Sequence, residues 1–264
     1  MSDVDGVLFF SDVMPPAAVV ADARRIEGLG YGSLWLPDLF GRELFVTAAY
    51  LLAATTRIRV ATGIANIYAR DAISAAQAAR TLSELYDGRF ILGLGVSHPP
   101  AAEARGHRWE PPVKKLGAYL EGIARAHVSS PEPAVAAPIF VAAHGPRLLA
   151  LAAEHADGAN TYLMPPAHTR EAREILGVGK QLNVVLPCCL CPEAATAREV
   201  GRNALAMYRK LPAYQRQWAR FGFDARDTDG DGSDRLVDTI VAWGDEAALR
   251  ARIAELIDAG AVRS

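Results

Sequence analysis

The stretch Arg-Ile-Arg-Val-Ala-Thr-Gly-Ile-Ala-Asn-Ile-Tyr-Ala-Arg-Asp (57–71), with its continuation to Ile-Leu-Gly-Leu-Gly-Val-Ser-His (91–98), decides the fold. The apolar runs Ile58–Ala61 and Phe90–Leu94 predict two buried strands. Between them, Asp71 is placed to cap a helix that runs to about Tyr86, because the apolar residues there recur near the helical period. This is one strand-helix-strand unit. Polar residues follow each strand, which is where α/β folds place their chemistry.

Strands and helices alternate along the rest of the chain. Further strands are predicted at residues 7–10, 33–36, 139–143, 159–163 and 182–190. A helical insert at 193–223 and an acidic loop at 224–234 follow, and then helices at 236–243 and 246–259. Seven strands separated by helices indicate an α/β fold of the parallel barrel type, with an open doubly wound sheet as the alternative. No Gly-x-Gly-x-x-Gly turn follows the first strand, which argues against a dinucleotide-binding Rossmann unit.

Composition excludes several classes of partner. The chain has 264 residues, 51% of them hydrophobic, and a net charge of −2 without a long basic run, so nucleic acid is not an expected partner. No apolar stretch approaches the ~18 residues of a membrane span, so no membrane interaction is expected. The acidic start Met-Ser-Asp-Val-Asp lacks the pattern of a signal peptide, which predicts a cytoplasmic protein.

No metal site is expected. Cys188, Cys189 and Cys191 lie together in an apolar strand, which predicts buried structural thiols. Residues 227–232 copy the first half of a calcium loop. However, Asp234 and Asp238 stand where that loop needs an apolar residue and a bidentate glutamate. A solvated acidic loop is therefore the expected structure.

Several motifs together resemble a known family. They are residues 29–38, 61–71, 88–98, 142–149, 156–159 and 241–245. Over nearly the full chain and in the family order, they resemble the bacterial-luciferase-like monooxygenase superfamily, in its branch of F420-dependent oxidoreductases. The resemblance implies a TIM-type (β/α)8 barrel with a helical insert after strand 7. Residues 1–264 would form a single barrel domain, with 193–235 as insert and loop, and only residues 262–264 would begin an incomplete eighth strand.

The resemblance also implies a site. Coenzyme F420 is the implied cofactor, with FMN as the alternative, and its ring would lie across the carboxyl ends of the strands. Asp38 matches the acidic residue that faces the deazaflavin, and the Gly63-Ile64 bond matches a non-prolyl cis peptide behind the ring. The other implied cofactor contacts are Asn66, Val96, Ser97, His144, Gly145, Arg147, Leu148 and Tyr162.

Physical chemistry supports the loop on the phosphate side independently. Gly145-Pro146 places a glycine and a proline at a helix start, which leaves free N–H groups and the positive end of the helix dipole for a phosphate. Arg147 adds a positive charge in the first turn. The alternative is that Arg147 is an ordinary solvated surface residue.

The chain departs from the sugar-phosphate dehydrogenases of this superfamily at two positions. Leu39 replaces a histidine, and His98 replaces a glutamate, so sugar-phosphate oxidation is not implied. Asp38 and His98 are the candidate catalytic residues, because an imidazole donates or accepts protons near neutral pH. The alternatives are a helix cap for Asp38 and a capping or packing role for His98. His107 and Trp109 either line a substrate pocket or lie on a surface loop. Tyr208, Tyr214 and Trp218 in the helical insert either cover the pocket as a lid or pack the core.

The resulting functional hypothesis is hydride transfer between F420 and a small-molecule organic substrate. One alternative is an FMN-dependent monooxygenase that uses O2 and a partner flavin reductase. Another is an inactive truncated barrel. The helix at 43–54 is apolar almost all round and its neighbour at 72–85 is alanine-rich, and related barrels pair through these helices, so a homodimer is expected.

Overall fold

The computed structural model describes residues 6–8 and 10–261, and the chain divides into two compact units. Within the described residues, the first unit contains those up to 143 and 150–159, and the second contains 144–149 and 160–261. The prediction that residues 1–264 form a single domain stays a prediction.

Parallel strands form the sheet of the first unit. In their order across the sheet they are β1 (Gly6–Leu8), β2 (Ser33–Leu36), β3 (Arg59–Thr62), β5 (Phe90–Gly95) and β6 (Ile139–Ala142). The short strand β4 (Ala65–Asn66) pairs with the end of β5. The register sets Leu34 beside Val60 and Ala61 beside Ile91. All of these pairs are parallel, so the carboxyl ends of β2, β3 and β5 share one edge of this sheet.

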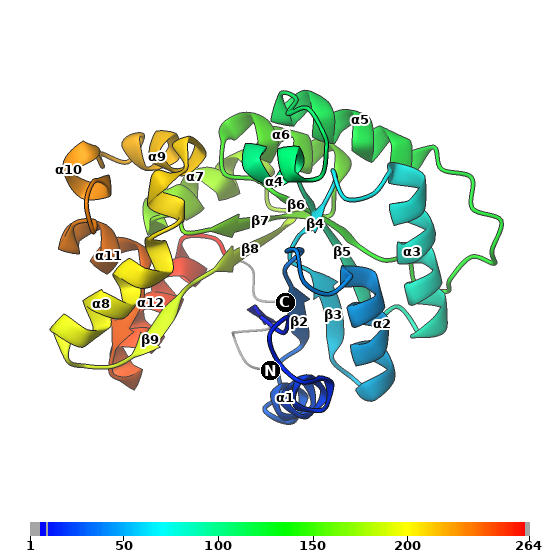
Figure 1. The fold of residues 1–264 in the computed structure, drawn as a ribbon, viewed down its shortest axis with the longest axis horizontal. Coiled ribbons are helices and arrows are strands. Elements are labelled where there is room, and N and C mark those ends of the chain that lie inside the picture. The colour runs from blue at the N-terminus through cyan, green and yellow to red at the C-terminus, as the bar shows by residue number, and fades with distance from the viewer. Residues whose placement is uncertain (1–5, 9, 262–264) are drawn as a thin grey trace. The chain divides into compact units, whose positions relative to one another are not determined.

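Helices follow these strands along the chain, and α2 and α3 lie beside β3 and β5 in Figure 1. They are α1 (Pro16–Gly28), α2 (Leu44–Ala54), α3 (Ala72–Leu85), α4 (Pro99–Ala104) and α5 (Pro112–Ala124). The Asp71 carboxylate accepts a hydrogen bond from the Ser74 N–H at 2.8 Å, which confirms the predicted cap of α3. In the core, the Trp35 and Phe140 rings meet edge to face at 5.7 Å.

The second unit combines the ends of the sheet with a mainly helical part. Strand β7 (Gly158–Tyr162) begins in the first unit and ends here, next to β8 (Gln181–Val185), and β9 (Cys188–Leu190) pairs in parallel with β10 (Ala242–Gly244). The helices are α6 (Pro146–His155, ending in the first unit), α7 (Pro166–Leu176), α8 (Ala194–Leu205), η1 (Tyr208–Lys210), α9 (Pro212–Ala219), α10 (Ala225–Thr228), α11 (Asp234–Ile240) and α12 (Glu246–Asp258).

Aromatic residues of the predicted insert build the core of the second unit. Trp218 is 0% exposed, and its indole Nε1–H donates to the Leu163 carbonyl at 2.7 Å. Tyr214 is also buried, whereas Tyr208 is partly buried against the same cluster. For Tyr214 and Trp218 the core-packing interpretation is therefore confirmed.

Three predicted elements have different boundaries in the structure. The strand at 182–190 is two strands, because Pro187, which has no N–H to donate, separates β8 from β9. The helix at 236–243 ends at Ile240, and the extended residue Val241 leads into β10. The irregular stretch after His98 contains α4.

The prediction of buried cysteines is wrong. Cys188 is exposed, Cys189 and Cys191 are half-buried, and all three are free thiols. The reason is that β9 belongs to a two-stranded sheet, so fewer neighbouring elements cover it than cover a strand in the large sheet. Within residues 6–8 and 10–261, no group of three or more His, Cys, Asp or Glu residues is placed to hold a metal ion.

The acidic loop is only partly solvated. Asp229 and Asp231 are exposed, but Asp227 is buried and pairs with Arg235. Hydrogen bonding to Arg235 is the main reason why the pKa of Asp227 falls to about 2. The guanidinium of the buried Arg209 donates to the Thr228 and Gly230 carbonyls. The Arg209 guanidinium thus binds backbone oxygens of the loop whose sequence copies the first half of a calcium loop.

Two predictions concern residues outside the described part of the chain. The predicted first strand includes Phe9, and the predicted start of an eighth strand comprises residues 262–264. Phe9 and residues 262–264 lie outside the described residues. Within residues 6–8 and 10–261, no helix has both the length and the apolar character needed to cross a membrane.

Candidate functional site

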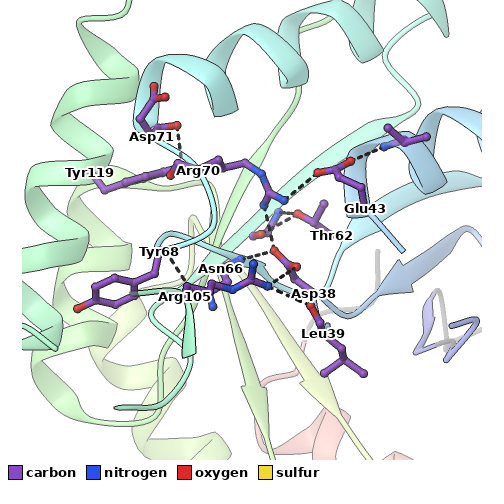
Figure 2. A network of polar contacts seen from close by, with 12 residues as sticks. Asp38, Leu39, Glu43, Thr62, Asn66, Tyr68, Arg70, Asp71, Arg105 and Tyr119 are labelled. Carbon is purple, nitrogen blue, oxygen red and sulfur yellow. Dashed lines mark hydrogen bonds and ion pairs between the residues drawn. The ribbon is translucent and has the colours of Figure 1, made fainter. Parts of the chain in front are cut away.

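Asp38 lies two residues after β2 and is the centre of a polar network in the first unit (Figure 2). Its side chain is only 5% exposed. The Oδ2 atom accepts one hydrogen bond from the backbone N–H of Asn66 at 3.0 Å and another from Arg70 Nη1 at 3.0 Å. The structure therefore brings together two residues of the predicted ring site, Asp38 and Asn66. The helix-cap alternative for Asp38 is not what is observed.

Two arginines compensate the buried charge of Asp38. Arg70 also donates to Glu43 Oε1 at 2.9 Å, and its guanidinium lies 4.6 Å from the centre of the Phe45 ring. Arg105 Nη2 lies 3.5 Å from Asp38 Oδ1 and donates to the Leu39 carbonyl at 3.0 Å. A carboxylate held in this way has a fixed orientation, because each oxygen already faces a cationic donor.

The residues behind the predicted ring position form a tightly packed segment. The Gly63-Ile64 peptide bond is cis, at the position that the resemblance implies. The Thr62 hydroxyl donates to the Gly93 carbonyl at 2.7 Å and accepts from the Gly93 N–H at 2.8 Å. A Cβ on Gly95 would lie 2.7 Å from the Ile64 side chain, so only glycine leaves room for Ile64 there. The cis bond is confirmed, whereas cofactor contact by Gly63 and Ile64 stays a prediction.

The turn after β5 carries Val96, Ser97 and His98, all of them half-buried. Ser97 has a positive φ of 59°, which is uncommon for a residue with a side chain. His98 stands at the N-cap position of α4, yet its side chain makes no capping hydrogen bond. Burial lowers the pKa of His98, which favours the neutral imidazole at pH 7. A neutral imidazole is suited to accept a proton.

The predicted phosphate loop belongs to the second unit. His144 and Gly145 precede α6, whose first turn has no acidic residue. The backbone N–H of Leu148 is already used, since it donates to the Gly145 carbonyl at 3.0 Å. Arg147 is exposed, and within the described chain no ion pair or hydrogen bond of its side chain is found. The positive helix end and an available guanidinium suit an anion.

Sequence reasoning missed the residue that holds this loop. His168 is fully buried at the start of α7, and its Nε2–H donates to the His144 carbonyl at 2.7 Å. Burial is the main reason why the pKa of His168 is lowered, so the ring is neutral and keeps this donor. The hydrogen bond points the His144 carbonyl at His168. No sequence signal marks His168, because the contact joins residues 24 positions apart.

Tyr162 lies at the end of β7 in the same unit. Its ring meets Tyr208 edge to face at 5.3 Å, and Tyr208 meets Tyr214 at 5.1 Å. The Tyr214 ring lies 5.4 Å from His144. Burial raises the pKa of Tyr162, so its hydroxyl stays protonated and is a hydrogen-bond donor at neutral pH. These ring contacts link Tyr162 to the phosphate loop.

Comparison with known proteins gives a consistent family signal. A family model described as luciferase-like monooxygenase matches residues 6–263. A 5,10-methylenetetrahydromethanopterin reductase of Methanolobus tindarius is 26% identical over 219 residues, 73% of this chain and 67% of that protein. A Mycobacterium tuberculosis protein, provisionally named a coenzyme F420-dependent oxidoreductase, is 29% identical over 176 residues, 54% of this chain and 50% of that protein. The alignment thus spans half the length of the second relative.

A solved structure extends the similarity to three dimensions. An F420-dependent secondary alcohol dehydrogenase, in complex with an F420-acetone adduct, has a TM-score of 0.78 at 16% identity. The similarity covers 99% of this chain and 92% of that one. At this identity the similarity concerns the fold alone, and it confirms the predicted TIM-type (β/α)8 barrel as the fold class.

Proposed function

Because the chain belongs to the luciferase-like monooxygenase family, we propose that it is an F420-dependent oxidoreductase acting on a small organic substrate. The relatives described above support this cofactor. One observation of the structure carries the proposal. Buried Asp38 binds the backbone of Asn66, next to the cis Gly63-Ile64 bond, and the resemblance assigns all of these residues to the deazaflavin ring.

The residues present fit the chemistry of this cofactor, which carries a phosphate and a planar ring. In the second unit, the loop from His144 to Leu148 leads into the start of α6, where the helix dipole is positive, and Arg147 offers a guanidinium with no partner in the described chain. In the first unit, Asn66, Val96 and Ser97 would contact the ring. When bound, F420 would supply the hydride donor or acceptor.

The chain's own groups would orient the reactants and move a proton. Asp38, fixed by Arg70 and Arg105, would present a carboxylate of constant orientation. His98, which is half-buried and favoured as the neutral imidazole, would accept or donate the proton at a ring nitrogen. Half-burial of this turn would also limit the access of water to the reacting groups.

Substitution of His98 tests the proton-transfer role. His98→Ala should lower turnover by ~10²–10⁴ and leave F420 affinity within a few-fold. The pH–rate profile should lose the limb that reports the imidazole. The pKa of His98 is lowered, so that limb should lie on the acid side of the ordinary histidine range. If turnover and profile survive, His98 is structural.

Charge reversal tests the phosphate loop. Arg147→Glu should weaken F420 binding by roughly 1–3 kcal/mol, the scale of a charged hydrogen bond. Arg170→Glu is the matched control, because Arg170 is also exposed, lies in the first turns of α7 and has no role in the proposal. Equal affinities for the two variants by fluorescence titration would remove Arg147 from the site.

We also propose that the chain forms a homodimer through α2 and α3. One side of α2 is buried in the first unit, but Val46 is 69% and Tyr50 48% exposed on another. Ile73 and Leu85 of α3 are exposed as well. An open apolar groove of about 310 Å³ runs beside Val46 and Tyr50. Light scattering at micromolar concentration should give the mass of two chains, and a monomer mass would refute this.

A further inference from the structure

An open recess of about 400 Å³ lies in the first unit, on the segment between α4 and α5. Its lining comprises Tyr68, His107, Arg108, Trp109, Glu110 and Pro111. The sequence left open whether His107 and Trp109 line a pocket or merely lie on the surface. In the structure, both of them line this recess.

Aromatic rings form part of the wall of the recess, whose lining is otherwise mainly polar. The Tyr68 and Trp109 rings stack at 5.6 Å with an angle of 22° between their planes, and the His107 ring lies 5.7 Å from Tyr68. Tyr68 is buried, and its hydroxyl accepts a hydrogen bond from the Glu110 N–H at 2.9 Å. Trp109 is half-buried and faces the recess. A wall of this kind favours a flat, aromatic ligand.

The charge balance of the recess is positive, although the whole chain carries −2. Its one carboxylate, Glu110, is neutralised by Lys115 at 2.7 Å. Arg108 is exposed, and within residues 6–8 and 10–261 its side chain forms no hydrogen bond or ion pair. Hydrogen bonding to Lys115 lowers the pKa of Glu110 in the recess, and Lys114 adds a further cation that lowers it as well. A small anion would therefore find a guanidinium that makes no direct hydrogen bond or ion pair in the described chain, and the planar fork of arginine matches a carboxylate.

We propose that this recess binds an aromatic carboxylate, with its ring on Trp109 and its acid group on Arg108. Tyr68, which lines the recess, follows Asn66 of the candidate ring site by two positions, and its backbone N–H donates to Asn66 Oδ1 at 3.0 Å. An aromatic acid bound there is the substrate class of the oxidoreductase. This last step rests on the proposed function, whereas the binding site itself does not.

Three probes separate the contribution of the aromatic ring from that of the carboxylate. Benzoate has the ring and the charge, benzamide keeps the ring without the charge, and cyclohexanecarboxylate keeps the charge without the aromatic ring. The full chain without cofactor is titrated with each by calorimetry and by tryptophan emission. Benzoate should bind saturably, and each of the other two should bind about tenfold more weakly. Equal affinity for benzamide, or no saturable binding of benzoate, would overturn the proposal.

Variants assign the binding to the recess. Arg108→Gln should weaken benzoate binding by about tenfold and remove the preference for benzoate over benzamide, whereas Arg108→Lys should retain most of it. Arg250→Gln, which alters an exposed arginine of α12, should change nothing. Trp109→Phe should abolish the emission change while binding persists by calorimetry. If Arg108→Gln behaves like Arg250→Gln, the carboxylate does not bind there.

A final experiment tests the substrate role separately. Benzoate added to the F420-bound chain should change the visible absorption of F420, and this change should be lost in Arg108→Gln. Intact benzoate binding with an unchanged F420 spectrum would refute the substrate role and leave the site standing. Failure of F420 to bind would refute the proposed function and leave the apo titrations unaffected.

Discussion

The structure makes Arg70 the main support of the buried Asp38 carboxylate, and Arg70→Met tests this. Methionine has a similar length and no charge. The substitution removes the 3.0 Å contact with Asp38 and the 2.9 Å contact with Glu43. It leaves Asp38 with the Asn66 N–H and with Arg105 at 3.5 Å.

The magnitude follows from burial. Removing one partner of a buried ion pair costs about 3–5 kcal/mol, because the other charge stays buried without compensation. The two contacts that Asp38 retains reduce this cost, and we expect a loss of about 2–3 kcal/mol in the free energy of unfolding. The Glu43 side chain is 51% exposed, so its lost pair adds only about 0.5 kcal/mol or less.

Urea unfolding of four proteins measures the effect: the wild type, Arg70→Met, Asp38→Asn and the double variant. The double-mutant cycle should give a coupling energy of at least about 1 kcal/mol between the two side chains. As a control, Arg25→Met removes an exposed pair with Asp22 and should change stability by less than about 0.5 kcal/mol. A coupling energy near zero, or equal effects of Arg70→Met and Arg25→Met, would refute the network.

Three further predictions concern stability and the phosphate loop. Gly93→Ala places a Cβ 2.0 Å from a backbone oxygen of β3 and should lower the free energy of unfolding, measured in urea, by about 3 kcal/mol or more. As its control, Gly117→Ala in α5 makes only an ordinary contact at 3.6 Å and should leave stability unchanged or increase it. Burial raises the pKa of Glu27, but hydrogen bonds from three backbone N–H groups outweigh this effect and bring the pKa to about 2. Glu27→Gln should therefore show its full loss of unfolding free energy above about pH 4.5, and this loss should vanish as the pH falls toward 2. His168→Gln keeps a donor to the His144 carbonyl and should preserve the protection of amides from hydrogen exchange in the predicted phosphate loop. His168→Met has no such donor and should raise the exchange rate there by roughly tenfold. Equal exchange rates in the two variants would show that this hydrogen bond does not order the loop.

The sequence predicts most of the first unit because local signals and packing agree there. The apolar run at 90–94 is β5, and Asp71 caps α3 as expected. The cis Gly63-Ile64 bond was predicted from the resemblance alone, since nothing in the local residue types requires it. Element boundaries that depend on a single residue were predicted less well. Pro187, for example, divides the expected seventh strand into β8 and β9.

The candidate site was predicted only where the family motifs are contiguous in sequence. Asp38 and Asn66 were identified, but the arginines around Asp38 were not, because a surface arginine and a paired one look alike in sequence. Arg105 lies 67 residues from Asp38 along the chain, and no periodic pattern reports such a contact. Strand β10 was missed for the same reason, because it forms only by pairing with β9, which is distant in sequence.

The proposed function requires that this chain binds coenzyme F420. Purified protein titrated with F420, and separately with FMN, tests it most directly when followed by cofactor fluorescence and absorption. We predict saturable binding of one F420 per chain, weaker binding of FMN, and weaker F420 binding in Arg147→Glu than in Arg170→Glu. Binding of FMN in preference to F420 would support the monooxygenase alternative instead, and binding of neither cofactor would contradict the proposed function altogether.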